Sequence, residues 1–210
     1  MAATERKQVR RSTVVLLFLG MGVALGVTLA SIAPVPDERQ TIEWLDNPRS
    51  LGEFDLEADT GKYDNHSLVG HWTIVLFGFL HCPDICPTSL SQLASLADDF
   101  AEKSIDQDLA YVFVSVDPGR DSVSEIGQYV QHFDSSIRGV TGKAEQLARF
   151  AGDLGVQFKV SAASDEYAVA HSITFSIIGP EGALRGRFRP GFDVSDLTKN
   201  FVSKLREASI

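Results

Sequence analysis

The sequence of 210 residues contains little cysteine and little positive charge. Its two cysteines are too few for the disulfide framework that replaces a large core in small secreted domains. Lysine and arginine number 19 against 28 aspartate and glutamate residues, and the net charge of −9 argues against a nucleic-acid partner. Hydrophobic residues make up 44% of the chain and charged residues 22%, which excludes a disordered chain and a coiled coil.

One long segment, Thr13 to Ala33, has no charged residue. A helix of these 21 residues would be about 30 Å long, the hydrocarbon thickness of a bilayer. Four positive charges precede the segment, at Arg6, Lys7, Arg10 and Arg11. We therefore predict a single-pass anchor in the inner membrane of a bacterial cell, with residues 1–12 in the cytoplasm and the chain from residue 34 onward in the periplasm.

A cleaved signal peptide is the alternative, because Ser31–Ala33 offers small residues at a possible cleavage point. The apolar core of a signal peptide is usually only about 7–15 residues long, which favours the anchor. Both interpretations place the rest of the chain in the periplasm, where cysteines tend to oxidise. Residues 34–50 contain three prolines and four acidic residues, and we interpret them as a linker to a domain of residues 51–210.

The apolar pattern of residues 51–210 predicts an α/β domain. A hairpin turns at Asp59–Lys62, and the buried strand at Trp72–Leu80 follows it. Further strands are expected at 109–116, 172–178 and 184–189, with one more between the second and third helices; the helices are expected at 88–100, 122–133, 143–154 and 194–206. This alternation indicates a central sheet with helices on both faces. The topology resembles a thioredoxin fold with an N-terminal β-hairpin extension.

Both cysteines lie in the segment His81-Cys82-Pro83-Asp84-Ile85-Cys86-Pro87, between the first buried strand and a helix. The carboxyl end of a strand is where α/β sheets bind ligands, and a helix N-terminus favours a thiolate over a thiol. In a helix, residues four apart have Cβ atoms about 5–6 Å apart, whereas a disulfide requires about 3.5–4.5 Å. The spacing therefore leaves redox chemistry and metal binding open, and favours the metal because a bridging ion needs less distortion.

A soft metal held by two thiolates needs a further ligand, and five histidines are available. His171 directly precedes the strand expected at 172–178, which should lie near the cysteine strand. His81 follows a strand end, and we expect its side chain to point away from Cys82. Two thiolates and one imidazole suit copper. Zinc is the chemical rival, with water or Asp84 as a fourth ligand.

Three segments in the same order carry a family resemblance: FGFLHCPDICPTSL at Phe77–Leu90, VFVSVDPGRDS at 112–122 and AHSITFSIIGPEG at 170–182. Together they resemble the Sco/SenC family of membrane-anchored copper chaperones with a thioredoxin fold. The similarity extends from about Phe54 to the C-terminus. A lone C-x-x-x-C spacing would be weak evidence, whereas three ordered motifs are specific.

The resemblance implies that Cys82, Cys86 and His171 bind one copper ion, as Cu(I) or Cu(II). It also implies delivery of that ion to the dinuclear copper site of cytochrome c oxidase. In a thioredoxin fold a cis-proline occupies the position of His171 and faces the active cysteines. Family members commonly carry an acidic residue before this histidine, and here the residue is Ala170.

The segment Asp117-Pro118-Gly119-Arg120-Asp121 has two interpretations. It can be a strand exit with a Pro-Gly turn and an acidic cap for the next helix. It can also bring Asp117 and Asp121 near the copper loop, where they would support the ligands or dock a partner. Both aspartates are therefore candidates for the site.

Two functions remain from different classes. The leading hypothesis is a metallochaperone, not an enzyme, that obtains copper from an upstream donor or is kept reduced by a thiol reductant, and passes copper to the copper-bearing oxidase subunit. The alternative is a thiol–disulfide oxidoreductase that uses Cys82 and Cys86 through a mixed disulfide, for instance to reduce the client's copper-ligand cysteines. The second function does not require His171.

Overall fold

The computed structural model describes residues 42–105, 108–163 and 166–208. The expected anchor at residues 13–33 and the segment before it lie outside these residues. Of the helices that are described, none combines the length and the apolar character needed to cross a membrane. All described residues belong to one unit, which starts at Glu38.

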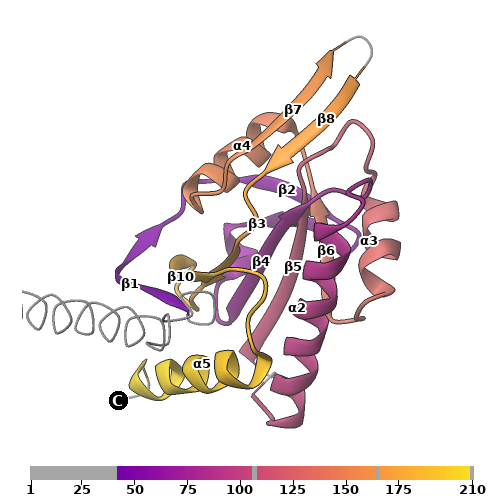
Figure 1. Ribbon diagram of the computed structural model, residues 1–210. Coiled ribbons are helices and arrows are strands. Elements are labelled where there is room, and N and C mark those ends of the chain that lie inside the picture. The colour runs from indigo at the N-terminus through magenta and orange to yellow at the C-terminus, as the bar shows by residue number, and fades with distance from the viewer. Residues whose placement is uncertain (1–41, 106–107, 164–165, 209–210) are drawn as a thin grey trace, which may run out of the picture. The chain divides into compact units, whose positions relative to one another are not determined.

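A mixed eight-stranded sheet forms the centre of this unit (Figure 1). Its strands are β1 (Glu43–Ser50), β2 (Asp55–Ala58), β3 (Gly61–Asp64), β4 (Trp72–Gly78), β5 (Leu109–Ser115), β6 (Ile137–Thr141), β9 (Phe175–Ile178) and β10 (Ala183–Phe188). The helices are α2 (Ile85–Glu102), α3 (Val123–Gln131), α4 (Ala144–Asp153) and α5 (Val194–Ala208), with a short 3-10 turn η1 (Asn65–Leu68). Strands β7 (Phe158–Ala163) and β8 (Glu166–His171) form a separate two-stranded sheet.

The strand order in the large sheet is β1-β10-β9-β4-β5-β6-β2-β3. Strands β4, β5 and β6 are parallel, and the other neighbours are antiparallel. The register pairs Gly78 at the end of β4 with Ser115 at the end of β5. The loops that leave these parallel strands therefore emerge at one edge of the sheet, which is where the cysteine segment and the Asp117–Asp121 segment both lie.

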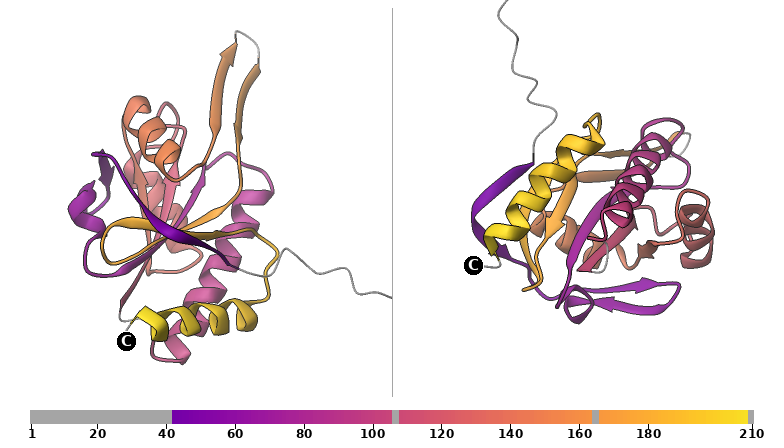
Figure 2. Two further views of the ribbon diagram at one scale, coloured as in Figure 1. Left: turned by 90° about the vertical axis from the view of Figure 1, so that its left-hand side faces the viewer. Right: turned by 90° about the horizontal axis from the view of Figure 1, so that it is seen from below.

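The core lies on both faces of the sheet, as the sequence predicted. Ile74 and Leu76 of β4 belong to a cluster with residues of α2 and α5, which lie side by side on one face (Figure 2). Val75 and Phe77, the alternate residues of β4, belong to the opposite cluster with residues of α4 and the β2–β3 hairpin. Every residue of β4 is buried. Burial on both faces explains why this strand has a continuous apolar sequence.

Two local predictions are confirmed. The hairpin of β2 and β3 turns between Ala58 and Gly61, as the turn residues indicated. At the start of α3, the Ser122 side chain accepts a hydrogen bond from the Glu125 amide, and Glu125 reciprocates by accepting from the Ser122 amide. This capping box fixes the point at which the chain turns from the Asp117–Asp121 segment into the helix.

The folded domain begins earlier than predicted. Residues 43–50, assigned above to the linker 34–50, form β1 and pair with β10 at the edge of the sheet. Trp44 of this strand packs its ring against Phe201 of α5 and donates a hydrogen bond from Nε1 to Asn200. The prolines and acidic residues suggested a linker. The packing of Trp44 and the pairing with β10 order the segment instead.

The hairpin of β7 and β8 was not predicted. It projects from the rest of the unit (Figures 1 and 2). As a consequence β9 begins at Phe175, not at residue 172, and His171 is the last residue of β8. Apolar and polar residues alternate from Phe158 onward, a pattern typical of a strand. The stronger patterns of the helix before it and the strand after it made this short alternation easy to overlook.

Candidate metal centre

The two cysteines lie directly after β4, at the carboxyl edge of the parallel strands. The chain leaves the strand in a turn, closed by a hydrogen bond of 3.3 Å from the amide of Cys82 to the carbonyl of Phe79. Helix α2 then begins at Ile85, so that Cys86 lies in its first turn. The N-cap residue Asp84 makes no capping hydrogen bond with its side chain. The predicted strand–loop–helix placement of the cysteines is therefore confirmed.

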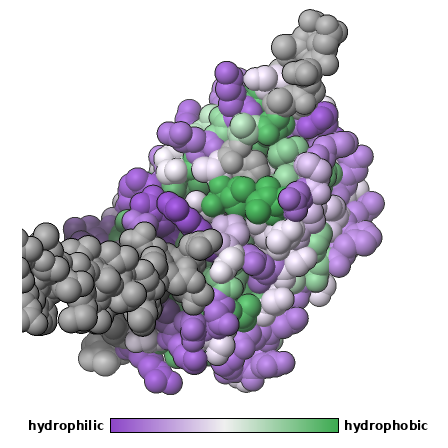
Figure 3. Space-filling view, in the orientation of Figure 1, coloured by the Kyte–Doolittle hydropathy of each residue, from purple (hydrophilic) through white to green (hydrophobic). Residues whose placement is uncertain are grey.

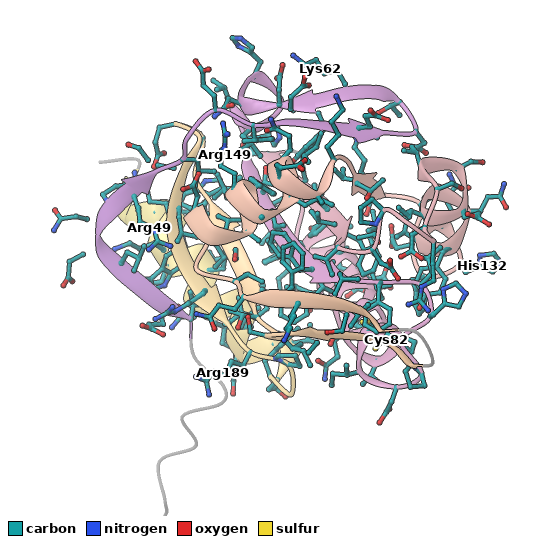
Figure 4. All side chains as sticks on the ribbon, turned by 90° about the horizontal axis from the view of Figure 1, so that it is seen from above. Arg49, Lys62, Cys82, His132, Arg149 and Arg189 are labelled. Carbon is teal, nitrogen blue, oxygen red and sulfur yellow. The ribbon has the colours of Figure 1, made fainter. Side chains whose placement is uncertain are left out.

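Both cysteines are buried thiols. Cys82 is 9% exposed and Cys86 is 2% exposed, and with Phe79 they form a small apolar cluster of their own. Ile85 and Val169 pack against this cluster. In the view of Figure 4, Cys82 is well separated from the labelled basic residues such as Arg49 and Lys62. The environment of the sulfurs is thus apolar and remote from those cations.

Gly78, the last residue of β4, provides the space that Cys86 occupies. A Cβ atom at this position would lie 2.5 Å from Cε2 of Phe113 and 3.0 Å from Sγ of Cys86. These distances are too short for carbon and sulfur atoms to occupy without displacement. The absence of a side chain at Gly78 therefore leaves room beside the strand for both the Cys86 sulfur and the Phe113 ring.

The protonation of Cys86 differs from the prediction. A helix N-terminus was expected to favour the thiolate, but burial raises the pKa of the Cys86 thiol to about 12, and the adjacent Cys82 thiol adds to the increase. A hydrogen bond from the backbone of Phe79 acts in the opposite direction with a smaller effect. Desolvation outweighs the helix terminus because the sulfur is almost entirely removed from water. The metal-free site therefore holds Cys86 as a thiol at neutral pH.

We expect alkylation of Cys86 by iodoacetamide to be slow and strongly pH-dependent. Because the thiolate is the reactive form and burial, the largest cause of the raised pKa, persists without Cys82, the rate in a Cys82→Ser variant should rise about tenfold per pH unit from pH 7 to beyond the ordinary thiol pKa of about 8.5. Mass spectrometry of quenched samples measures this rate. The same variant unfolded in urea is the control, and its rate should level off above the ordinary thiol pKa of about 8.5. A folded-state rate that levels off at the same pH would contradict the raised pKa.

His171 is held at the base of the β7–β8 hairpin. Its backbone is in register with Phe158, and the next residue, Ser172, donates its amide to the carbonyl of Gln157 at 2.9 Å. Val169, two residues earlier on β8, packs against the cysteine cluster. The backbone of β8 continues from Val169 to His171, where the strand ends. The hairpin thus brings a segment distant in sequence to the cysteine loop.

Asp121 lies at the site, although its two partners there were not foreseen. Its side chain is fully buried. One oxygen, Oδ2, accepts hydrogen bonds from the amide of Leu80 at 2.9 Å and from the hydroxyl of Ser115 at 2.6 Å. The carboxylate therefore ties the end of β5 to the residue that opens the cysteine turn. Asp121 lies 35 positions after Cys86 in the sequence. Apart from the family motif, nothing in the sequence indicated that its side chain contacts the cysteine turn.

Asp117 is also buried, and its side chain pairs with an arginine of its own segment. The Nε atom of Arg120 donates to Oδ2 of Asp117 at 2.6 Å. The carbonyl of Asp117 accepts from the amides of Arg120 and Asp121, which closes the turn before α3. These contacts correspond to the structural interpretation given above for this residue. Asp117 shapes the segment from which Asp121 reaches the cysteine loop.

The other histidines differ in their relation to the site. His66 lies in η1, and His132 follows α3, where Nδ1 is 2.7 Å from the carbonyl of Gln128 (Figure 4). His81 is at the tip of the cysteine turn, with Nδ1 3.6 Å from Oδ1 of Asp121. From the sequence, the side chain of His81 was expected to point away from Cys82, as neighbouring side chains do in a strand. It lies beyond the end of β4, in a turn, so strand alternation does not apply to it.

The surface near the base of the hairpin carries apolar residues. Figure 3 shows them in green just below the end of β8, whereas much of the remaining visible surface is polar. Chemically, the site combines two buried thiols, the buried carboxylate of Asp121 and the exposed imidazole of His81. Thiols of this kind form metal bonds after losing their protons, or a disulfide on oxidation.

Comparison with known proteins gives a consistent result. The SCO1/SenC family profile matches residues 44–206. The mitochondrial SCO1 homolog 1 of Arabidopsis thaliana is 38% identical over 158 residues, which are 74% of this chain; the chain spans only 47% of that protein's length. The residues matched by the family profile include both cysteines and the β7–β8 hairpin.

Solved structures agree. The copper-bound ScoI of Arabidopsis thaliana is 37% identical, with a TM-score of 0.67, and the match covers 74% of this chain and 98% of that one. Copper-bound yeast Sco1 is 31% identical, with a TM-score of 0.64 over 76% of this chain and 88% of that one. These similarities confirm the α/β thioredoxin-like fold that the sequence predicted. With a profile that covers most of its length and relatives above 30% identity, this chain belongs to the SCO1/SenC family.

Proposed function

We propose that this protein is a membrane-anchored copper metallochaperone. It binds one copper ion through Cys82, Cys86 and His171 and delivers the ion to the dinuclear copper site of cytochrome c oxidase. The observation that carries the proposal is the packing of Val169 against the cysteine cluster, because it joins the strand that ends in His171 to the two sulfurs. Family membership and the copper-bound relatives support the choice of metal, and the client is the one that the family resemblance implies.

The chemistry of the donor set favours copper. Thiolates are soft ligands and select Cu(I), and one imidazole completes a three-coordinate site for that ion. Zinc would require a fourth donor in a tetrahedral arrangement. A three-coordinate ion also leaves a position open for a ligand of the recipient.

Loading of copper requires that Cys86 lose its proton. The raised pKa of this thiol means that the metal, not a nearby cation, must drive the deprotonation. Affinity for copper therefore increases with pH. The apolar surroundings of the sulfurs keep water from the metal once it is bound, and the membrane anchor proposed at residues 13–33 would keep the carrier close to its membrane-bound client.

The proposal is tested by titrating the reduced full-length protein with Cu(I) in competition with a chromogenic chelator. We expect one copper ion per chain. His171→Ala should weaken the affinity by at least tenfold, a change of the size seen when groups that support metal ligands are lost. His66→Ala is the matched control, because His66 is an exposed histidine of the same domain, and it should leave the affinity unchanged.

Two results would contradict the proposal. Unchanged copper binding by His171→Ala would remove this residue from the ligand set. Failure of the wild-type protein to bind copper, combined with rapid reduction of a protein disulfide by its metal-free form, would favour the thiol–disulfide oxidoreductase instead. The second activity should depend on both cysteines and be insensitive to His171→Ala.

A further inference from the structure

Asp121 has one carboxylate oxygen with an assigned role and one without. Oδ2 accepts the hydrogen bonds from Leu80 and Ser115 described above. Oδ1 is buried and has no hydrogen-bond partner. A buried polar oxygen without a donor is costly, because it has lost its hydration and gained no hydrogen bond in exchange. We therefore expect Oδ1 to accept a hydrogen bond when a donor comes within reach.

The imidazole of His81 can supply a hydrogen-bond donor to this oxygen. Its Nδ1 is 3.6 Å from Oδ1, slightly beyond hydrogen-bond distance, so a small rotation of the ring closes the contact. The side chain of His81 is 60% exposed, whereas that of Asp121 is 0% exposed. Metal-binding histidines commonly donate one ring nitrogen to a carboxylate, which fixes the ring and leaves the other nitrogen with its lone pair for the metal. In His81 that second nitrogen is Nε2.

The position of His81 relative to the sulfurs completes the argument. It precedes Cys82 directly, in the turn that the Phe79–Cys82 hydrogen bond closes. The carboxylate that faces His81 is also held by Leu80, so the turn and the imidazole share one support. Cys82 is the more exposed of the two cysteines. His81 is thus an exposed imidazole next in sequence to the more accessible of the two sulfurs.

We propose that His81, oriented by Asp121, is a transient copper ligand through which the ion enters and leaves the site. This inference rests on the proposed function, since it assumes that copper is bound at Cys82 and Cys86. It adds a ligand that is used during transfer and not in the resting complex. Asp121 acts as a positioning residue, because it contacts the imidazole and not the metal.

The transfer step is a ligand exchange. A bond forms between Nε2 of His81 and copper as the bond to the nitrogen of His171 breaks, while the thiolates of Cys82 and Cys86 both remain bound. One neutral imidazole replaces another, so the charge of the complex, its number of protons and the oxidation state of copper stay the same. A recipient ligand then displaces His81 in the same way, without an oxidant or reductant.

The experiment measures transfer of Cu(I) from the full-length protein to excess bicinchoninate by stopped-flow absorbance. His81→Ala should slow transfer about tenfold, the lower range for loss of a group that supports a metal site, while the equilibrium affinity changes little. Asp121→Asn should slow it by less. His132→Ala is the matched control and should transfer at the wild-type rate. Free imidazole should restore transfer in His81→Ala and have no such effect on Asp121→Asn, a response that a purely structural role would not give.

The outcomes separate this inference from the function on which it rests. A wild-type rate in His81→Ala overturns the inference and leaves the chaperone function intact. Loss of copper binding at equilibrium in His81→Ala also overturns it, because His81 would then be a resident ligand. If the wild-type protein binds no copper, both are wrong. Thermal unfolding of each variant shows that its fold is retained, and His81, as an exposed residue, should be replaceable without loss of stability.

Discussion

Replacing Cys86 with serine is expected to remove copper binding almost completely. The sulfur is one of three proposed donors and is the more deeply buried of the two cysteines. A serine hydroxyl is a poor ligand for a soft ion and stays protonated at neutral pH. The loss of affinity should exceed the roughly 100-fold seen when groups behind a metal ligand are changed. Competition titration with Cu(I) measures it.

The stability of this variant must be measured beside its affinity. A hydroxyl in place of the thiol lies in an apolar cluster and costs about 1–3 kcal/mol if it finds no partner. Cys86→Ala avoids the buried hydroxyl, and it should lose copper equally while remaining closer to the wild type in urea unfolding. Tight copper binding by a folded Cys86→Ala protein would show that the metal is held elsewhere.

Replacing Gly78 with alanine should damage the fold and the site together. The added Cβ would meet Phe113 at 2.5 Å and the Cys86 sulfur at 3.0 Å, so the ring and the sulfur must both move. Overpacking of this kind typically lowers the free energy of unfolding by about 1–3 kcal/mol. Displacement of the sulfur should also weaken copper binding, and urea unfolding and Cu(I) competition measure the two effects.

Gly152→Ala is the matched control for this prediction. Gly152 lies in α4, and a Cβ atom there meets nothing within 4 Å. Alanine should therefore stabilise the helix by up to about 1 kcal/mol and leave copper binding unchanged. If Gly78→Ala were as stable as Gly152→Ala and bound copper normally, the close packing of Cys86 on β4 would be wrong.

Much of the fold could be predicted because its signals are local. The apolar run of β4, the helical spacing of α2 and the capping box of α3 each depend on residues within one element. The position of the cysteines after β4 followed from the same pattern. What the sequence could not supply were contacts between elements. The link from Asp121 to Leu80 depends on the parallel register of β4 and β5, and the helix-terminus argument for Cys86 ignored the burial that the completed fold imposes.

The errors have the same origin. Residues 43–50 were assigned to a linker because their order depends on pairing with β10 at the far end of the chain. The hairpin ending at His171 was missed because a two-stranded sheet has a weak local signal. His81 was judged by strand alternation, although the strand ends at Gly78, three residues earlier. The approach of His81 to Asp121 could not be predicted, because it depends on how the loop after β4 and the loop after β5 lie relative to each other.

Cys86, one of the proposed metal ligands, lies beside β4 in a buried apolar cluster of the folded domain. Ligand occupancy and global unfolding are then thermodynamically linked, because the unfolded chain does not present the assembled donors. By mass action, copper at 100 times its dissociation constant should stabilise the native state by about 2.7 kcal/mol. The melting temperature of the protein should therefore rise with the fraction of protein that has copper bound. The metal-free form, which unfolds more readily, should be the more susceptible to proteolysis.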